Sequence, residues 1–403
     1  MPTADIANSG LDSKGHTIKL TSVPLAGKYD MDHSNAAFVS MYDGGKIDGD
    51  DLISCQPSSG AKCPPDPAFR FVQPSDVAPY FYLAENYGFA NRMFQSNQGP
   101  SFPAHQYIIA GTSQPSATSL FFAANDPFPI APGGAGCNAA AATKVLMIGP
   151  DNMKSRGAPC FEHGTLTDLI DNPPAGARRG ITWRYYTPTE GSIWTSPNAI
   201  RHMCQPSTSA NACVGPDWTD GKIITNSAQV LTDVAHSNLA SVSWVIPTSL
   251  ESDHAGGTDG TGPAWVASLV NAIGNSAYWS NTVILITWDD WGGWYDHVTP
   301  PIGNQYGYYE NGSRVPLLVV SPYTPAGYVS QVPHTFGSIL KFIETAYGLP
   351  VIPPGTFQDA RSDDLSDFFN FSMPPRPFQT VPATPGADFF LHDKRPAEGP
   401  DTD

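Results

Sequence analysis

Residues 282–301 read T-V-I-L-I-T-W-D-D-W-G-G-W-Y-D-H-V-T-P-P, an apolar and β-branched run that ends in two adjacent carboxylates. The run from Thr282 to Ile286 predicts a buried strand. Asp289 and Asp290 follow it, so the strand would carry both acids at its carboxyl end. In open α/β sheets ligands bind at these ends, because the chain leaves the hydrogen-bonded ladder there. The stretch therefore predicts an α/β fold with a site at the end of this strand.

Two neighbouring carboxylates suit a divalent cation, since such ions prefer hard oxygen ligands. The glycine pair that follows would let the backbone or a substrate approach them closely. The alternative is that Asp289 and Asp290 only open a turn. For an isolated Asp-Asp pair, this alternative is favoured over a metal site by about two to one. A second pair, Asp296 and His297, lies in the same proline-stopped loop and favours a functional site.

A second strand is predicted over residues 239–248, and the sequence S-D-H, which ends at His254, follows it. A glycine-rich turn and a helix over residues 264–273 then lead back to the strand described above. If both strands share a sheet, this β-α-β unit requires them to be parallel. Their carboxyl ends would then bring His254 near Asp289 and Asp290.

Residues 97–103, N-Q-G-P-S-F-P, hold Ser101 in a rigid turn between Pro100 and Phe102. Such a turn can present a hydroxyl at a helix end or to a metal. Serine is a poor nucleophile unless a base or a metal activates it. The short motif alone favours an ordinary turn residue by about three to one. His105 follows closely, and we expect it to support the site or the packing.

The sequence D-M-D-H-S, residues 30–34, precedes an amphipathic stretch over residues 36–42. Asp32 or Ser34 would cap that helix and leave His33 at its positive end. The alternative is a surface histidine near a cap, which the motif alone favours by about two to one.

The composition excludes one broad class of function. The 403 residues include 37 Asp and Glu against 21 Lys and Arg, for a formal net charge of −16 that is spread along the chain. Nucleic-acid binding needs a basic face, so we expect none. We also expect no transmembrane segment, since no apolar run approaches about 20 residues. A single domain is expected over residues 1–403, with an irregular arm over 1–24 and a polar tail over 393–403.

Six cysteines lie in loops rich in Pro, Gly, Ser and Asn. An even number at short separations fits disulfides formed in an oxidising compartment, although six cysteines allow fifteen pairings. Zinc binding is disfavoured, because no C-x-x-C or C-x-x-H spacing occurs. We therefore expect a secreted or periplasmic protein. The local pairs are Cys55 with Cys63, Cys137 with Cys160, and Cys204 with Cys213.

Four blocks together resemble the bacterial phosphoesterase family that contains phospholipases C and secreted acid phosphatases. They are D-M-D-H-S-N-A-A-F, N-Q-G-P-S-F-P-A-H-Q, S-D-H with the helix start after it, and W-D-D-W-G-G-W-Y-D-H-V. Each block alone is weak, but four in the family's order are specific, and the similarity runs from about Leu25 to Phe371. It implies an alkaline-phosphatase-like three-layer α/β sandwich with a mostly parallel central sheet and long loop excursions.

The resemblance also implies metal-dependent hydrolysis of phosphate esters. Ser101 looks like the nucleophile that takes up the phosphoryl group while bound to the metal. Asp289 and Asp290 look like ligands of this divalent ion, whose identity the resemblance leaves open. The substrate is a phosphate monoester or a diester, with a phospholipid head group as one candidate.

His33 and His254 look like groups that contact the phosphate, stabilise its charge or protonate the leaving oxygen. His297 lies close to the same loop, with a less defined role. Family members begin with a strand that ends in an E-N-R-S-F-D-like string, whose Glu and Asn complete the metal site. No such string occurs here, since Glu85-Asn86 lies inside an expected helix. The first twenty residues also lack a signal peptide's basic start and apolar core, so we expect an incomplete N-terminus.

Two alternatives stay open at this point. Trp288, Trp291 and Trp294 would form a cage for a choline-like cation, or they would pack in the core, which is favoured by about three to one. The second alternative concerns the function of the whole chain. It would be a secreted, non-catalytic protein that keeps the phosphoesterase scaffold after the loss of the N-terminal strand that carries metal ligands.

Overall fold

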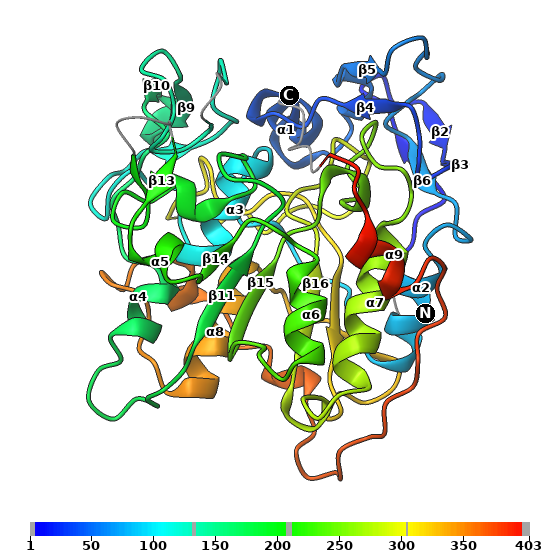
Figure 1. The fold of residues 1–403 in the computed structure, drawn as a ribbon. Coiled ribbons are helices and arrows are strands. Elements are labelled where there is room, and N and C mark those ends of the chain that lie inside the picture. Colours follow the sequence, from blue (N-terminus) through cyan, green and yellow to red (C-terminus); the bar gives the residue numbers. More distant parts are fainter. Residues whose placement is uncertain (1–4, 131–133, 207–211, 304, 397–403) are drawn as a thin grey trace.

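The computed structural model describes residues 5–130, 134–206, 212–303 and 305–396. Two small sheets form the centre of the fold (Figure 1). The first contains β14 (Ile223–Ile224), β11 (Trp183–Tyr186) and β15 (Val242–Val245). The second contains β16 (Ile284–Thr287), β17 (Leu317–Val320), β7 (Gly88–Ala90) and β18 (Tyr328–Ser330). The apolar runs that predict strands over residues 239–248 and 282–286 supply β15 and β16.

Most of these strands run in one direction within their sheet. In the first sheet β11 is parallel to both β14 and β15. In the second sheet β17 is antiparallel to β16 and β7, whereas β18 is parallel to β7. Only β17 therefore runs against its neighbours, and the expected mostly parallel arrangement is confirmed.

Helices cover both faces of the central strands. One layer contains α3 (Ser101–Ala110), α4 (Leu166–Asp171) and α8 (Phe336–Tyr347), and the other contains α2 (Ala78–Asn86), α6 (Gln229–Ala235) and α7 (Gly262–Gly274). Side chains along β17 alternate between the layers, since successive residues of a strand point to opposite faces. Leu317 and Val319 pack with α3 and α8, whereas Leu318 and Val320 pack with α2 and α7. The expected three-layer α/β sandwich is confirmed.

The remaining elements lie mostly at one end of the central strands, at the top of Figure 1. On one side of this end lie β8 (Phe122–Ala123), β9 (Val145–Ile148) and β10 (Lys154–Gly157). On the other lie β1 (Ser9–Leu11), β2 (Thr17–Lys19), β3 (Thr21–Val23), β4 (Tyr29–Met31), β5 (Cys55–Pro57), β6 (Arg70–Val72) and α1 (Asn35–Tyr42). The chain also forms β12 (Gln205–Pro206), β13 (Cys213–Val214), α5 (Pro216–Thr219) and α9 (Ala387–His392). None of the helices in the described residues is long and apolar enough to cross a lipid bilayer.

The stretch expected to be an irregular N-terminal arm contains three strands, so that expectation is corrected. β1 and β2 form an antiparallel hairpin, and β3 pairs with β6. The carboxylate of Asp12 accepts hydrogen bonds from the backbone N–H groups of Lys14 (3.0 Å) and His16 (2.7 Å), which closes the hairpin turn. Gly15 adopts a positive φ of 79° in this turn. Turn hydrogen bonds of this kind order a stretch whose composition alone looks irregular.

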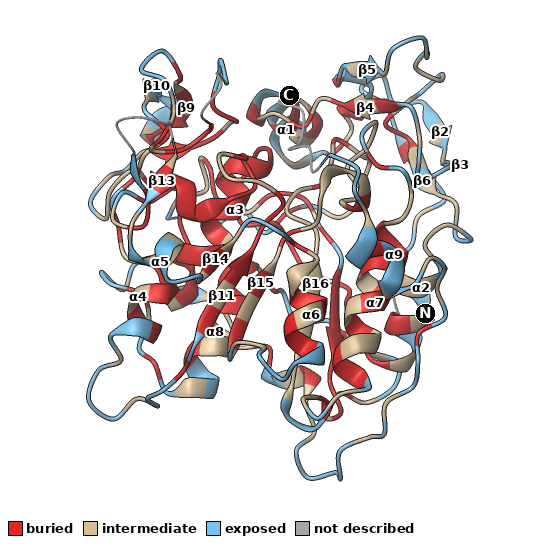
Figure 2. Cartoon of the chain, in the orientation of Figure 1, coloured by how far each residue is buried: buried red, intermediate tan, exposed pale blue. Residues whose placement is uncertain are grey.

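The β-α-β unit required β15 and β16 to lie in one sheet, and this condition is not met. They belong to different hydrogen-bonded sheets, and no ladder joins them in the described part of the chain. The parallel pairing that a shared sheet would require is therefore not formed in the described residues. All four residues of β16 are partly exposed, although three of them are large and apolar (Figure 2). All four residues of β17 are buried by contrast, so β15 and β16 each end their sheet with an unpaired edge.

Several local predictions are confirmed. Three disulfides join Cys55 with Cys63, Cys137 with Cys160, and Cys204 with Cys213. Ser34, and not Asp32, caps α1, because its hydroxyl accepts a hydrogen bond from the backbone N–H of Ala37 at 3.2 Å. Asp32 instead accepts a hydrogen bond from the N–H of Ser34 at 2.9 Å.

Because its carboxyl group is buried, Glu344 on α8 should make the stability of the fold depend on pH. The side chains of Glu344 and Asp359 are both buried. Burial, together with the charge of Asp359, raises the pKa of Glu344 from 4.5 to about 8. The folded state therefore binds a proton that the unfolded state releases near pH 4.5. The stability that this proton contributes is present below pH 4.5 and is lost as the pH rises through about 8.

We expect Glu344→Gln to flatten this dependence. With these pKa values, the wild-type free energy of unfolding should fall by up to about 3–4 kcal/mol between pH 5 and pH 8 from this group, and less in the variant. Urea denaturation at pH 5, 6.5 and 8 measures the difference. The exposed Glu85→Gln is the matched control and should keep the wild-type slope. Equal slopes for wild type and Glu344→Gln would contradict the prediction.

Candidate active site

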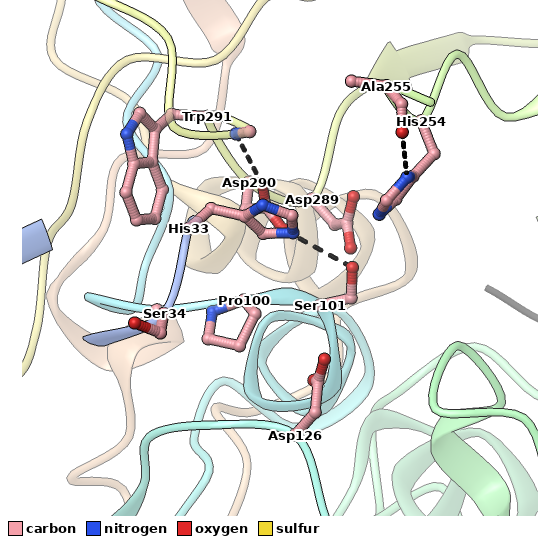
Figure 3. Close-up of polar contacts among 12 residues, drawn as sticks. His33, Ser34, Pro100, Ser101, Asp126, His254, Ala255, Asp289, Asp290 and Trp291 are labelled. Carbon is pink, nitrogen blue, oxygen red and sulfur yellow. Dashed lines mark hydrogen bonds and ion pairs between the residues drawn. The ribbon is translucent and has the colours of Figure 1, made fainter. Parts of the chain in front are cut away.

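Ser101 is the first residue of α3 and lies buried at its N-terminus (Figure 3). Pro100 precedes it in an extended conformation, which starts the helix without using a backbone N–H. The carboxylate of Asp126 accepts a hydrogen bond from the N–H of Phe102 at 2.9 Å. Gly99 is required here, since a Cβ would lie 2.3 Å from the carbonyl oxygen of Ala124. The hydroxyl thus sits at the positive end of a helix, where a phosphate group is favoured.

Asp290 follows β16 and lies against this serine. The Ser101 hydroxyl donates to Asp290 Oδ2 at 3.4 Å, and the backbone N–H of Gly292 donates to Asp290 Oδ1 at 2.7 Å. Gly292 and Gly293 adopt positive φ values of 62° and 71°. A Cβ on Gly293 would lie 2.6 Å from the Cβ of Met31, so the glycine pair permits a close approach of two chain segments.

Asp289 lies against His105, one turn into α3. The two side chains approach to 3.3 Å between His105 Nε2 and Asp289 Oδ2. Burial raises the pKa of Asp289, but hydrogen bonds and charge from His105, together with Ser101, outweigh it and hold the pKa well below its usual range. Asp289 is therefore ionised at neutral pH. His105 has the supporting position expected from the sequence.

His33 and His254 meet beside Asp290. His33 Nε2 lies 3.9 Å from Asp290 Oδ2, and the two imidazole rings approach edge to face with centroids 5.5 Å apart. His33 is buried after β4, and its Nδ1 lies 2.7 Å from the carbonyl oxygen of Met31. His254, in the loop after β15, places Nδ1 2.9 Å from the carbonyl oxygen of Ala255. The structure thus brings His33 and His254 to the carboxylates and the serine although β15 and β16 are unpaired.

His297 has different surroundings from the other candidate residues. It is exposed and lies against its neighbour Asp296, with 3.6 Å between His297 Nδ1 and Asp296 Oδ1. Asp296 also accepts two hydrogen bonds of 2.7 Å from the guanidinium of Arg314. Among the contacts of the described residues, none joins His297 to Ser101 or Asp290.

The tryptophans of this loop pack against other rings. Trp288 meets Tyr80 edge to face with centroids 4.9 Å apart, and Trp294 lies 5.5 Å from the ring of Tyr29. Trp291 is buried and packs its edge against His33 at 6.2 Å. These contacts favour packing over an aromatic cage.

The oxygens around Ser101 fit a divalent cation. Asp289 Oδ2 is buried and lies 3.3 Å from His105 Nε2, so this carboxylate is held ionised beside the serine, in the form that binds cations. Ser101 Oγ and the Asp290 carboxylate lie beside it (Figure 3). Two carboxylates and a hydroxyl form a hard oxygen set, although they supply fewer ligands than such ions usually take.

The structure also reveals neighbours that the motifs did not single out. Asp30 lies with His33 and His254, and each of the three offers one ligand atom within 4.8 Å of the others. Asp30 stands in the quoted D-M-D-H-S block, so the sequence carried a local signal for it. Asp126 lies 25 residues beyond Ser101, and no local pattern marks it.

A three-layer α/β fold with a buried serine, two carboxylates and two histidines at the ends of its strands defines a hydrolase-like class of site. The Phosphoesterase family profile matches residues 26–350. The chain therefore belongs to the Phosphoesterase family, as the resemblance of its four blocks implied.

Several relatives are bacterial phospholipases. The chain is 32% identical over 167 residues to phospholipase C B of Mycobacterium tuberculosis (strain CDC 1551 / Oshkosh), a match that covers 36% of this chain and 32% of that protein. It is 23% identical over 342 residues to the hemolytic phospholipase C of Pseudomonas aeruginosa, covering 75% of this chain and 43% of that protein. These matches span less than half of either relative's length.

Solved structures show only a general likeness. A protein of the alkaline phosphatase superfamily from Vibrio parahaemolyticus is 9% identical, with a TM-score of 0.38, and the match covers 86% of this chain and 68% of that chain.

We expect Gly293→Ala to destabilise the fold by about 1–3 kcal/mol, because the new Cβ meets Met31 and the backbone has a positive φ. Urea denaturation measures the loss. Gly303→Ala is the matched control, since its Cβ would meet no atom within 4 Å. A loss below about 0.5 kcal/mol in Gly293→Ala would show that the close approach is not constrained.

Proposed function

We propose that this protein hydrolyses phosphate esters through a covalent phosphoseryl intermediate on Ser101. One observation carries the proposal: the Ser101 hydroxyl lies at the N-terminus of α3 and 3.4 Å from Asp290 Oδ2. The helix end favours the negative charge of a phosphate, and the carboxylate orients the hydroxyl. Membership in the Phosphoesterase family supports this reaction class.

Asp289, Asp290 and Ser101 Oγ would hold a divalent cation. When bound, such an ion polarises the phosphate and lowers the pKa of the serine hydroxyl. The described residues supply three ligands for it, and the other positions are open to water or substrate. His105 keeps Asp289 ionised and in place, since its imidazole lies 3.3 Å from that carboxylate.

The chain's own residues account for both steps. Ser101 Oγ attacks phosphorus while its proton passes to Asp290, the bond from phosphorus to the leaving oxygen breaks, and His254 protonates that oxygen from the partly exposed side of the site. Water then attacks the phosphoserine and gives its proton to His254. The bond from phosphorus to Ser101 Oγ breaks, Oγ takes its proton back from Asp290, and free phosphate or a phosphomonoester leaves. His33, buried beside Asp290, contributes to the binding of the phosphate charge.

The names of the relatives support one substrate class within this proposal. Their names indicate phospholipases C, which favours a phosphodiester with a phospholipid head group over a monoester. Three disulfides support an exported protein, because such bonds persist in oxidising compartments.

We expect Ser101→Ala to lower kcat/KM for p-nitrophenyl-phosphocholine by a factor of about 10³ or more, since the nucleophile is lost. Ser268→Ala is the matched control, because this buried serine on α7 only donates to Ala264 within its own helix. Assays with p-nitrophenyl phosphate alongside distinguish a diesterase from a monoesterase. Retained turnover in Ser101→Ala would exclude Ser101 as the nucleophile. If wild type supplied with divalent cations hydrolyses neither ester, the non-catalytic alternative is favoured.

A further inference from the structure

The loop that carries His254 is joined to the end of β16 by side-chain contacts. β15 and β16 share no hydrogen-bonded ladder in the described part of the chain. Tyr80 on α2 contacts the segments that follow both strands, through Asp253 and Trp288. We propose that Tyr80 and Asp253 are positioning residues, which hold His254 in place for proton transfer to the leaving oxygen. This role rests on the proposed function, whereas the placement of the His254 ring does not.

Tyr80 contacts the residue that precedes each candidate group. Its hydroxyl donates a hydrogen bond to Asp253 Oδ2 at 2.6 Å, and its ring meets that of Trp288 edge to face with centroids 4.9 Å apart. Asp253 directly precedes His254, and Trp288 directly precedes Asp289. Burial and the charge of Asp253 raise the pKa of Tyr80 well above its usual value, so the phenol keeps its proton and stays a donor. One side chain therefore joins the proton donor to a carboxylate of the site.

Asp253 sets the direction in which the chain enters His254. It adopts a positive φ of 64°, a left-handed conformation that residues other than glycine rarely take and that Asp tolerates better than most. Its other oxygen, Oδ1, is enclosed by the start of α7, since a Cβ on Gly262 would overlap it. Such a backbone conformation persists when the surrounding structure fixes it. The hydrogen bond from Tyr80 and the close approach of Gly262 fix it from two sides.

The ring of His254 is oriented by its own neighbours. Its Nδ1 lies 2.9 Å from the carbonyl oxygen of Ala255, which only accepts, so Nδ1 carries a proton and Nε2 exchanges one with the leaving oxygen (Figure 3). The ring centroid lies 5.5 Å from that of His33 and 6.2 Å from that of Trp194. Proton transfer requires hydrogen-bond reach to the reacting oxygen, so a loop shift of about 1 Å is enough to lower the rate. The backbone anchor at Asp253 is therefore needed as well as the ring contacts.

Two esters that differ in their leaving group test this role. p-Nitrophenolate leaves readily without protonation, whereas the more basic phenolate depends on a proton donor. We expect Tyr80→Phe, which keeps the ring contact with Trp288, to lower kcat/KM about 10-fold for phenyl-phosphocholine and less than about 3-fold for p-nitrophenyl-phosphocholine. Asp253→Ala should lower the value for the phenyl ester about 10²-fold. Asp253→Asn should restore most of it, because Asn accepts the hydrogen bond from Tyr80 and tolerates the positive φ.

Tyr186→Phe is the matched control. It removes a hydrogen bond of 2.7 Å from a tyrosine hydroxyl to another carboxylate, that of Asp233, between β11 and α6. It should change kcat/KM for neither ester. In the His254→Ala background, Tyr80→Phe should cause no further loss, because the hydroxyl acts through His254. Equal losses for both esters in Tyr80→Phe and Asp253→Ala, or an added loss in the His254→Ala background, would overturn the positioning role.

The placement of the His254 ring also has a readout that needs no turnover. In the full chain labelled with ¹³C and ¹⁵N at histidine, the NMR signals of this imidazole are identified by their loss in His254→Ala. We expect Tyr80→Phe and Asp253→Ala to shift these signals and Tyr186→Phe to leave them in place, with circular dichroism confirming that each variant is folded. Unmoved signals in both variants would contradict the proposal. If the signals shift but the wild type supplied with divalent cations cleaves no ester, the proposed function fails and the placement of the ring stands.

Discussion

The candidate site depends on the close approach of chain segments that leave no room for side chains between them. Gly99 lies against the carbonyl oxygen of Ala124, and Gly293 lies against Met31, each at a distance that excludes a Cβ. The first approach fixes the start of α3, and the second fixes the loop after β16. With both in place, Ser101 Oγ and Asp290 Oδ2 lie 3.4 Å apart. The close approach of these two side chains therefore depends on backbone packing.

The electrostatics of the site follow from the same packing. Four ionisable side chains, Asp289, Asp290, His33 and His105, converge in a mostly buried region of a strongly acidic chain. Buried carboxylates are costly unless they are paired. His105 meets this requirement for Asp289, and the N-terminus of α3 adds a favourable dipole. The divalent cation proposed above would offset the remaining negative charge of the two carboxylates.

The sequence predicted what local patterns determine. Apolar periodicity predicted the strands β15 and β16 and the helices α1 and α7, short cysteine separations indicated the three disulfides, and the motifs singled out Ser101, Asp290, His33 and His254, which lie together. The sequence left open whether β15 and β16 share a sheet, because strand partners are chosen by tertiary packing and not by adjacency in sequence. Asp126 was missed because no local pattern marks it, whereas Asp30 stands in the quoted D-M-D-H-S block and was not singled out there. The hairpin of β1 and β2 was missed because it rests on the turn hydrogen bonds of Asp12.

The unpaired edges of β15 and β16 have a consequence for the behaviour of the protein in solution. Each edge presents a row of backbone N–H and C=O groups that another extended segment can hydrogen-bond. Large apolar residues on β16 remain partly exposed beside this edge. Soluble proteins usually protect such edges with charges, prolines or bulges, because an open edge templates the addition of strands from other molecules. An edge of β15 or β16 that became accessible to other molecules would be the place in this fold where further strands could add.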